Sequence, residues 1–175
     1  YRDERIEKFT SGTGFQVPFL EILRKPFEKA VTLTPRETME VVPLILRLKG
    51  KDRDRMNVAL TRLNRAIRRH SHEDRALDLA IALESLLVDG AGENTYRVSL
   101  RAALLYPGGL AKKLRARAIT KAVYVVRSSV AHSGRAEAKI KVDGRKEETN
   151  EVVNEGIQVC GEIIRQIAIR GAIPE

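Results

Sequence analysis

Four side chains near the end of one predicted helix have the chemistry needed to hold and cleave a phosphodiester: Tyr124, Arg127, Ser128 and His132. An imidazole can take the proton from a ribose 2′-hydroxyl or return one to a leaving oxygen. A guanidinium can hold a phosphate bidentately and offset the charge that grows on it. The hydroxyls of Ser128 and Tyr124 can donate hydrogen bonds to the same phosphate. These residue types therefore fit metal-free chemistry on a phosphate group.

The helix expected over residues 110–131 has to orient these side chains. At about 100° per residue, its apolar stripe consists of Ile119, Ala122, Val126 and Val130. With Tyr124 as the origin, six polar or aromatic side chains lie between about −60° and +80°, and we expect them to project away from that stripe, towards solvent, a groove or another subunit: Arg117, Lys121, Tyr124, Arg127, Ser128 and His132. The alternative is an ordinary ion pair for Arg127 and a helix-capping role for His132.

Apolar periodicity predicts further helices around this one. The first runs from about Asp54 and turns an apolar set inward: Val58, Leu60, Leu63, Ala66 and Ile67. The next begins after a cap at Ser71 and ends near Leu87, and a third covers about 93–105. The last covers about 150–170, with Cys160 inside its apolar stripe as a packed small side chain. Between them, residues 140–144 form either a small hairpin or a loop.

The chain divides by composition near residue 50. Residues 1–50 hold four of the six prolines, and Thr34 with Pro35 predicts a short helix start. We expect an irregular N-terminal segment with short helices, the possible tail of an upstream region. Residues 51–175 form an all-α bundle of four to five helices.

Composition excludes several classes of protein. The 175 residues are 43% hydrophobic and 31% charged, enough to bury a core. One cysteine and three histidines rule out a disulfide framework and a cysteine-rich metal site, and no apolar run approaches a membrane span. We therefore expect a soluble cytoplasmic protein without a metal or another cofactor.

Positive charge is concentrated in one stretch. The net charge is +9, and residues 94–136 contain no acidic side chain. Such a field attracts phosphate backbones, and the alternative is a solvated basic surface. The candidates for RNA contacts within this stretch are Arg101, Arg117 and Lys121.

Residues 124–134 read Tyr-Val-Val-Arg-Ser-Ser-Val-Ala-His-Ser-Gly and resemble the R-x4-H signature of HEPN domains, most closely that of the Apea-like branch. Residues 79–87 and 99–105 are similar to the two helices that precede the motif in that family. The resemblance extends over about 54–134. Two features depart from it: Ser128 follows the arginine where many of the nucleases have Asn, Asp or His, and Ser133 separates His132 from Gly134.

The resemblance implies a helical bundle that commonly dimerises, with the R-x4-H helices of two protomers facing a shared cleft. Many HEPN domains are metal-independent endoribonucleases that leave a 2′,3′-cyclic phosphate, and others only bind RNA or nucleotides. Carried over, Arg127 and His132 become the catalytic pair. A homodimer through this helix face, and an antitoxin or an upstream domain, are the partners expected besides RNA.

Glu84 is an acid on an otherwise apolar helix. Buried carboxylates are usually paired, so we expect a structural role with Arg101 or Arg127 as its partner. His70 and His72 flank a predicted turn, and we expect them to be solvated caps without a metal.

Two classes of function are consistent with these sequence features. The leading one is an Apea-like HEPN ribonuclease of a toxin or defence type. The alternative is a non-catalytic HEPN module that binds a nucleotide, RNA or a partner protein as part of a longer chain. A basic helical DNA-binding protein ranks last because no helix-turn-helix signature is present.

Overall fold

The computed structural model describes residues 42–88 and 94–174. Over these residues the chain forms, in order, helices and one hairpin: α4 (Gly50–Arg68), α5 (His72–Leu87), α6 (Asn94–Leu105), α7 (Leu110–Ser133), β1 (Lys139–Val142), β2 (Arg145–Glu148) and α8 (Thr149–Arg170). Residues 42–47 are also helical. The predicted all-α bundle is therefore confirmed, and the expected helix start at Thr34 lies outside the described residues.

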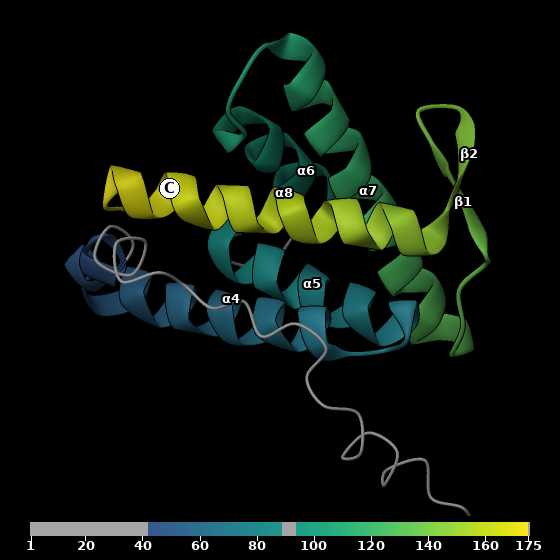
Figure 1. Ribbon diagram of the computed structural model, residues 1–175, viewed down its shortest axis with the longest axis horizontal. Coiled ribbons are helices and arrows are strands. Elements are labelled where there is room, and N and C mark those ends of the chain that lie inside the picture. Colours follow the sequence, from purple (N-terminus) through teal and green to yellow (C-terminus); the bar gives the residue numbers. More distant parts are fainter. Residues whose placement is uncertain (1–41, 89–93, 175) are drawn as a thin grey trace, which may run out of the picture. The chain divides into compact units, whose positions relative to one another are not determined.

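The helices pack as two pairs that share one partner. Helix α4 packs along α5, and α6 packs along α7. Helix α8 contacts α4, α5, α6 and α7, and in Figure 1 it runs as the yellow ribbon alongside α4 and across α7. The C-terminal helix thus joins the two pairs, and its position decides how α7 is presented.

Helix α8 approaches its neighbours most closely at Gly156. A Cβ atom added there would lie 2.7 Å from Val123 Cγ2 on α7 and 2.9 Å from Leu79 Cδ2 on α5. Both of those side chains are fully buried, so neither can swing aside. Only glycine allows three helices to meet this closely, because any side chain would force them apart.

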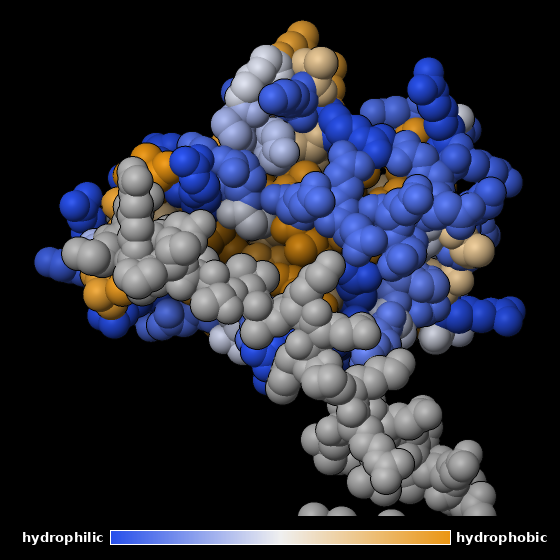
Figure 2. Space-filling view, in the orientation of Figure 1, coloured by the Kyte–Doolittle hydropathy of each residue, from blue (hydrophilic) through white to orange (hydrophobic). Residues whose placement is uncertain are grey.

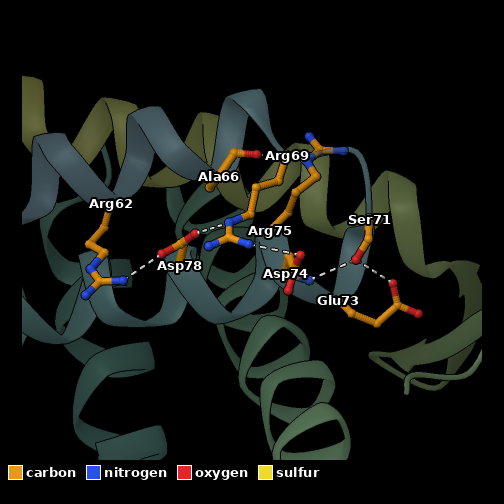
Figure 3. A network of polar contacts seen from close by, with 8 residues as sticks. All are labelled: Arg62, Ala66, Arg69, Ser71, Glu73, Asp74, Arg75 and Asp78. Carbon is orange, nitrogen blue, oxygen red and sulfur yellow. Dashed lines mark hydrogen bonds and ion pairs between the residues drawn. The ribbon is translucent and has the colours of Figure 1, made fainter. Parts of the chain in front are cut away.

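A buried carboxylate joins α4 to α5. Asp78 is only 3% exposed, and its two oxygens face Arg62 Nη1 at 2.9 Å and Arg69 Nε at 2.6 Å. Figure 3 shows both arginines pointing at Asp78 from α4 and its C-terminal end. Removal of Asp78 or of its arginine partners is expected to destabilise the fold strongly, because a charge is then left without its counter-charge.

The turn between α4 and α5 is held by a helix cap and by one arginine. Ser71 Oγ accepts a hydrogen bond from Asp74 N at 3.1 Å, which confirms the predicted cap and is drawn in Figure 3. Arg75 donates from Nε to Ala66 O at 3.0 Å and reaches α8 at Asn150 Oδ1 (3.0 Å) and Asn154 Oδ1 (2.5 Å). The Arg75 side chain therefore ties α4, α5 and α8 together.

The prediction of which α4 side chains face inward is wrong in part. Val58 is 44% exposed and Ile67 57% exposed, whereas the buried residues of this helix are Met56, Ala59 and Ala66. Among the described helices α4 packs mainly on α5 and α8, so it buries a narrower side than the apolar pattern suggests.

The segment after α7 is a hairpin, one of the two expected alternatives. Strands β1 and β2 are antiparallel, and Val142 pairs with Arg145 across a two-residue turn. Asp143 (φ 44°) and Gly144 (φ 86°) both adopt positive φ, as the tightest hairpin turns require. Cys160 is fully buried, as expected, and burial raises the pKa of its thiol to about 12.

Two glycines of α8 provide a matched pair of substitutions. We expect Gly156→Ala to destabilise the protein by about 1–3 kcal/mol, because overpacking outweighs the higher helix propensity of alanine. Gly161 lies in the same helix with nothing within 4 Å of an added Cβ, so Gly161→Ala should stabilise it by up to about 1 kcal/mol. Urea denaturation measures both, and equal effects would contradict the close approach at Gly156.

Candidate functional site

Ser128 and His132 are exposed on the last two turns of α7 and line the same open pocket. Thr95, from the first turn of α6, closes the pocket opposite them, and Tyr124 contributes to its lining. Its volume is about 390 Å³, enough for a phosphate and part of a nucleoside. The structure therefore brings together three of the four residues singled out on α7.

The end of α7 is fixed by its own hydroxyl groups. Gly134 adopts the left-handed conformation (φ 73°), and its N–H donates to Val130 O at 2.8 Å. Ser129 and Ser133 each donate a hydrogen bond to Arg135 O at 3.0 Å. Ser133, the residue that separates His132 from Gly134, thus secures the helix end, and His132 remains in an ordered last turn.

Tyr124 corrects the expectation that it projects away from the core. Its side chain is 4% exposed and belongs to the main hydrophobic cluster, and its hydroxyl donates to Ala80 O on α5 at 3.5 Å. Burial raises the pKa of Tyr124 well above its ordinary value, and the charge and hydrogen bond of Glu84 raise it further. Tyr124 is therefore a neutral wall of the pocket whose hydroxyl is already engaged.

Glu84 has a different partner from the one expected. It interacts with the Tyr124 hydroxyl, and no ion pair within 4 Å joins it to Arg101 or Arg127 in the described part of the chain. Arg101 instead donates from Nη1 to Leu87 O at 2.7 Å, which caps the C-terminal end of α5. The partner of Glu84 is thus an aromatic hydroxyl and not one of the two expected arginines.

Arg127 is exposed and does not line the pocket. Five positions separate it from His132, which places the two side chains about 140° apart around α7. Its positive charge still acts on Tyr124, where it opposes the rise in pKa. The structure thus separates the two residues of the R-x4-H pair within one chain.

The basic residues near the pocket fall into two groups, those without an acidic partner and those neutralised by an ion pair. Arg117 lies over the ring of Tyr96, 5.8 Å from the ring centroid, and Lys121 is exposed on the same side of α7. Arg115 is neutralised by Glu147 at 2.7 Å and Glu155 at 2.6 Å. The acid-free stretch therefore presents fewer free cations than its sequence suggests.

The sequence did not single out Thr95 and Tyr96, nor Val125 and Ser129, which line the pocket with Thr95. Thr95 and Tyr96 begin α6, and Tyr96 is 53% exposed. Nothing in their local sequence marks them, because their position beside α7 arises only when the two helices pack. His72, expected to be a solvated cap, has its Nε2 3.1 Å from Glu73 Oε1.

Comparisons with known proteins assign no function to this site. No family model, curated protein or solved structure matches this chain. Within residues 42–88 and 94–174, no group of three or more His, Cys, Asp or Glu side chains is placed to hold a metal ion. No helix in the same residues has the length and apolar character that crossing a bilayer requires.

Tyr124→Phe tests the buried hydroxyl. At neutral pH we expect a loss of about 0.5–1.5 kcal/mol, the usual net contribution of one hydrogen bond. Below about pH 10 the phenol keeps its proton in both states. Above it, the unfolded chain releases the proton while the folded protein retains it, so the stability of the wild type falls as pH rises.

The gap between wild type and Tyr124→Phe should therefore narrow between about pH 9 and 11, measured by urea denaturation. Tyr96→Phe, at an exposed ring, serves as the control and should follow the wild type. A gap of constant size across this range would contradict the assignment.

Proposed function

We propose that this protein is an Apea-like HEPN domain that acts on RNA as a metal-independent endoribonuclease. The observation that carries the proposal is the pocket at the end of α7, where Ser128 and His132 lie side by side next to basic residues. An imidazole and a hydroxyl in an open pocket can act on a phosphodiester without a metal ion. The likeness of residues 124–134 to the R-x4-H signature supports the same assignment.

In the proposed reaction, His132 removes the proton from a ribose 2′-hydroxyl. The 2′-oxygen attacks the adjacent phosphorus, the bond to the 5′-oxygen breaks, and that oxygen takes up a proton from water as it leaves, while His132 returns its proton to solvent. The products are a 2′,3′-cyclic phosphate and a 5′-hydroxyl. Arg127 offsets the charge on the pentacovalent phosphate, and Ser128 donates a hydrogen bond to it. Tyr124 shapes the pocket, since its own hydroxyl is engaged by α5.

A homodimer completes the site in this proposal. Arg127 does not line the pocket that holds His132, so the guanidinium has to reach the phosphate from elsewhere. Two copies that meet through this face of α7 would place Arg127 of one protomer at the pocket of its partner. The HEPN resemblance implies the same arrangement, and a toxin or defence role with an antitoxin follows from that resemblance alone.

One observation favours a second function, a non-catalytic module that binds a nucleotide, RNA or a partner protein. The pocket contains an imidazole and hydroxyls but no guanidinium. A single chain is thus equipped to bind a nucleotide, whereas catalysis needs the additional charge of Arg127.

Cleavage of mixed single-stranded RNA in EDTA tests the nuclease. We expect wild-type cleavage with cyclic-phosphate products, and a loss of about 100-fold or more in His132→Ala, the usual contribution of a general acid or base. His70→Ala removes an exposed histidine away from the pocket and should leave the rate unchanged. RNA binding without cleavage by the wild type would favour the binding module, and strict dependence on Mg²⁺ would exclude the mechanism.

Mixing two inactive variants tests the shared site. If Arg127 and His132 act from different protomers, a heterodimer of Arg127→Ala and His132→Ala contains one intact site. Random exchange of subunits should then restore roughly a quarter of the wild-type rate. Arg65→Ala, an exposed arginine of α4, controls for loss of charge. No recovery after subunit exchange would place both residues in one protomer's site.

A further inference from the structure

The outer face of the β1–β2 hairpin carries two cross-strand pairs of different character. Lys139 lies opposite Glu148, and Lys139 Nζ is 2.9 Å from Glu148 Oε1. The next pair on the same face is Lys141 opposite Lys146, and both side chains are exposed. One pair is matched in charge, and its neighbour places two positive charges directly opposite each other.

This second pair carries an uncompensated electrostatic cost. Like charges directly opposite in an antiparallel ladder destabilise the pairing, whereas opposite charges stabilise it. Within the described residues, neither Lys141 nor Lys146 forms an ion pair within 4 Å. Arg145 is also exposed, but it lies opposite Val142 in the ladder and its charge acts on Glu147. The Lys141–Lys146 pair therefore places two positive charges where the hairpin's own fold would be more stable without them.

The hairpin is also held in place. Val142 is buried on the inner face, Arg115 of α7 holds Glu147 of β2 with two short hydrogen bonds, and Thr149 N donates to Ala138 O at 2.8 Å. Figure 1 shows the hairpin at the start of α8, beside α7, and this side of the molecule is largely hydrophilic in Figure 2. A fixed array of cations binds an anion with less loss of conformational freedom than a flexible one.

We propose that Lys141 and Lys146 form an interaction surface for the phosphodiester backbone of RNA, separate from the pocket on α7. This inference rests on the proposed function, because it assigns a second contact to the same RNA. Successive phosphates of a strand would supply the negative charge that the lysine pair lacks. Residues 133–138 join the end of α7 directly to β1, and β1 contacts α7, so a strand leaving the pocket can reach the hairpin.

Lys146→Glu separates this role from a structural one, because it should move stability and binding in opposite directions. It converts the lysine pair into a Lys–Glu pair, so the melting temperature should rise by about 1–4 °C. Binding to a short mixed-sequence 2′-O-methyl RNA, which cannot be cleaved, should weaken about threefold or more. The slope of log Kd against log salt should fall by about 0.7 for each phosphate that the variant no longer neutralises.

Arg170→Glu provides the matched control. It makes the same change in net charge at an exposed residue about 30 Å along α8 from the hairpin, and it should leave RNA affinity within about twofold of the wild type. Equal weakening by both variants would overturn the surface, since total charge would then explain the binding.

The remaining outcomes distinguish the two proposals. RNA binding by the wild type with no change in Lys146→Glu overturns the hairpin surface and leaves the proposed function standing. No RNA binding by the wild type overturns both. Polyglutamate that binds the wild type as tightly as RNA does, but does not bind Lys146→Glu, would assign the hairpin to an acidic protein partner and overturn the RNA contact.

Discussion

The close approach at Gly156 is the constraint on which the rest of the bundle depends. With 2.7 Å and 2.9 Å left for a Cβ against Val123 and Leu79, α8 can sit between α5 and α7 only because it has no side chain there. That contact brings α7 against both helices, and the side of α7 that bears Tyr124 is closed by α5 at Ala80. Ser128 and His132, one and two turns further on, are left at the open edge. The pocket is thus a consequence of how tightly the centre packs.

The positive charge available at the surface of this protein depends more on which basic side chains are paired than on how many the sequence contains. Residues 94–136 hold cations and no acid, yet Arg115 is neutralised by two glutamates and Arg101 caps a helix end. Those two side chains stabilise the fold and weaken the surface field. Among the described residues, the exposed cations without an acidic partner within 4 Å include the lysine pair of the hairpin together with Lys112, Lys121, Arg127 and Arg135. Local excess of charge steers a polyanion, whereas paired cations contribute little to it.

Features determined by neighbouring residues were predictable from the sequence. The cap at Ser71, the course of α7 and α8, and the burial of Cys160 all follow from local pattern. Features determined by packing were not. Tyr124 lies opposite the apolar stripe on a helical projection and is nevertheless buried, because α7 is covered on more than one side. Val58 is the reverse case. It belongs to the apolar pattern of α4 but is exposed, because α4 lies at the edge of the described bundle. Thr95 entered the pocket through a tertiary contact that no local signal marks.

The same distinction bears on the R-x4-H pair. Arg127 and His132 are about one and a half helical turns apart. On any α-helix, side chains at that spacing point in directions that differ by about 140°. In the proposed reaction both groups contact one phosphate, and within one chain only His132 of the two lines the pocket. The end of α7 is rigid, because Ser129, Ser133 and Gly134 all fix it through backbone carbonyls. Bending of the helix end is therefore disfavoured, and in the proposed reaction the charge of Arg127 comes from a second protomer. The proposed homodimer would supply it twice, because a two-fold axis that brings one arginine to the partner's pocket brings the other as well.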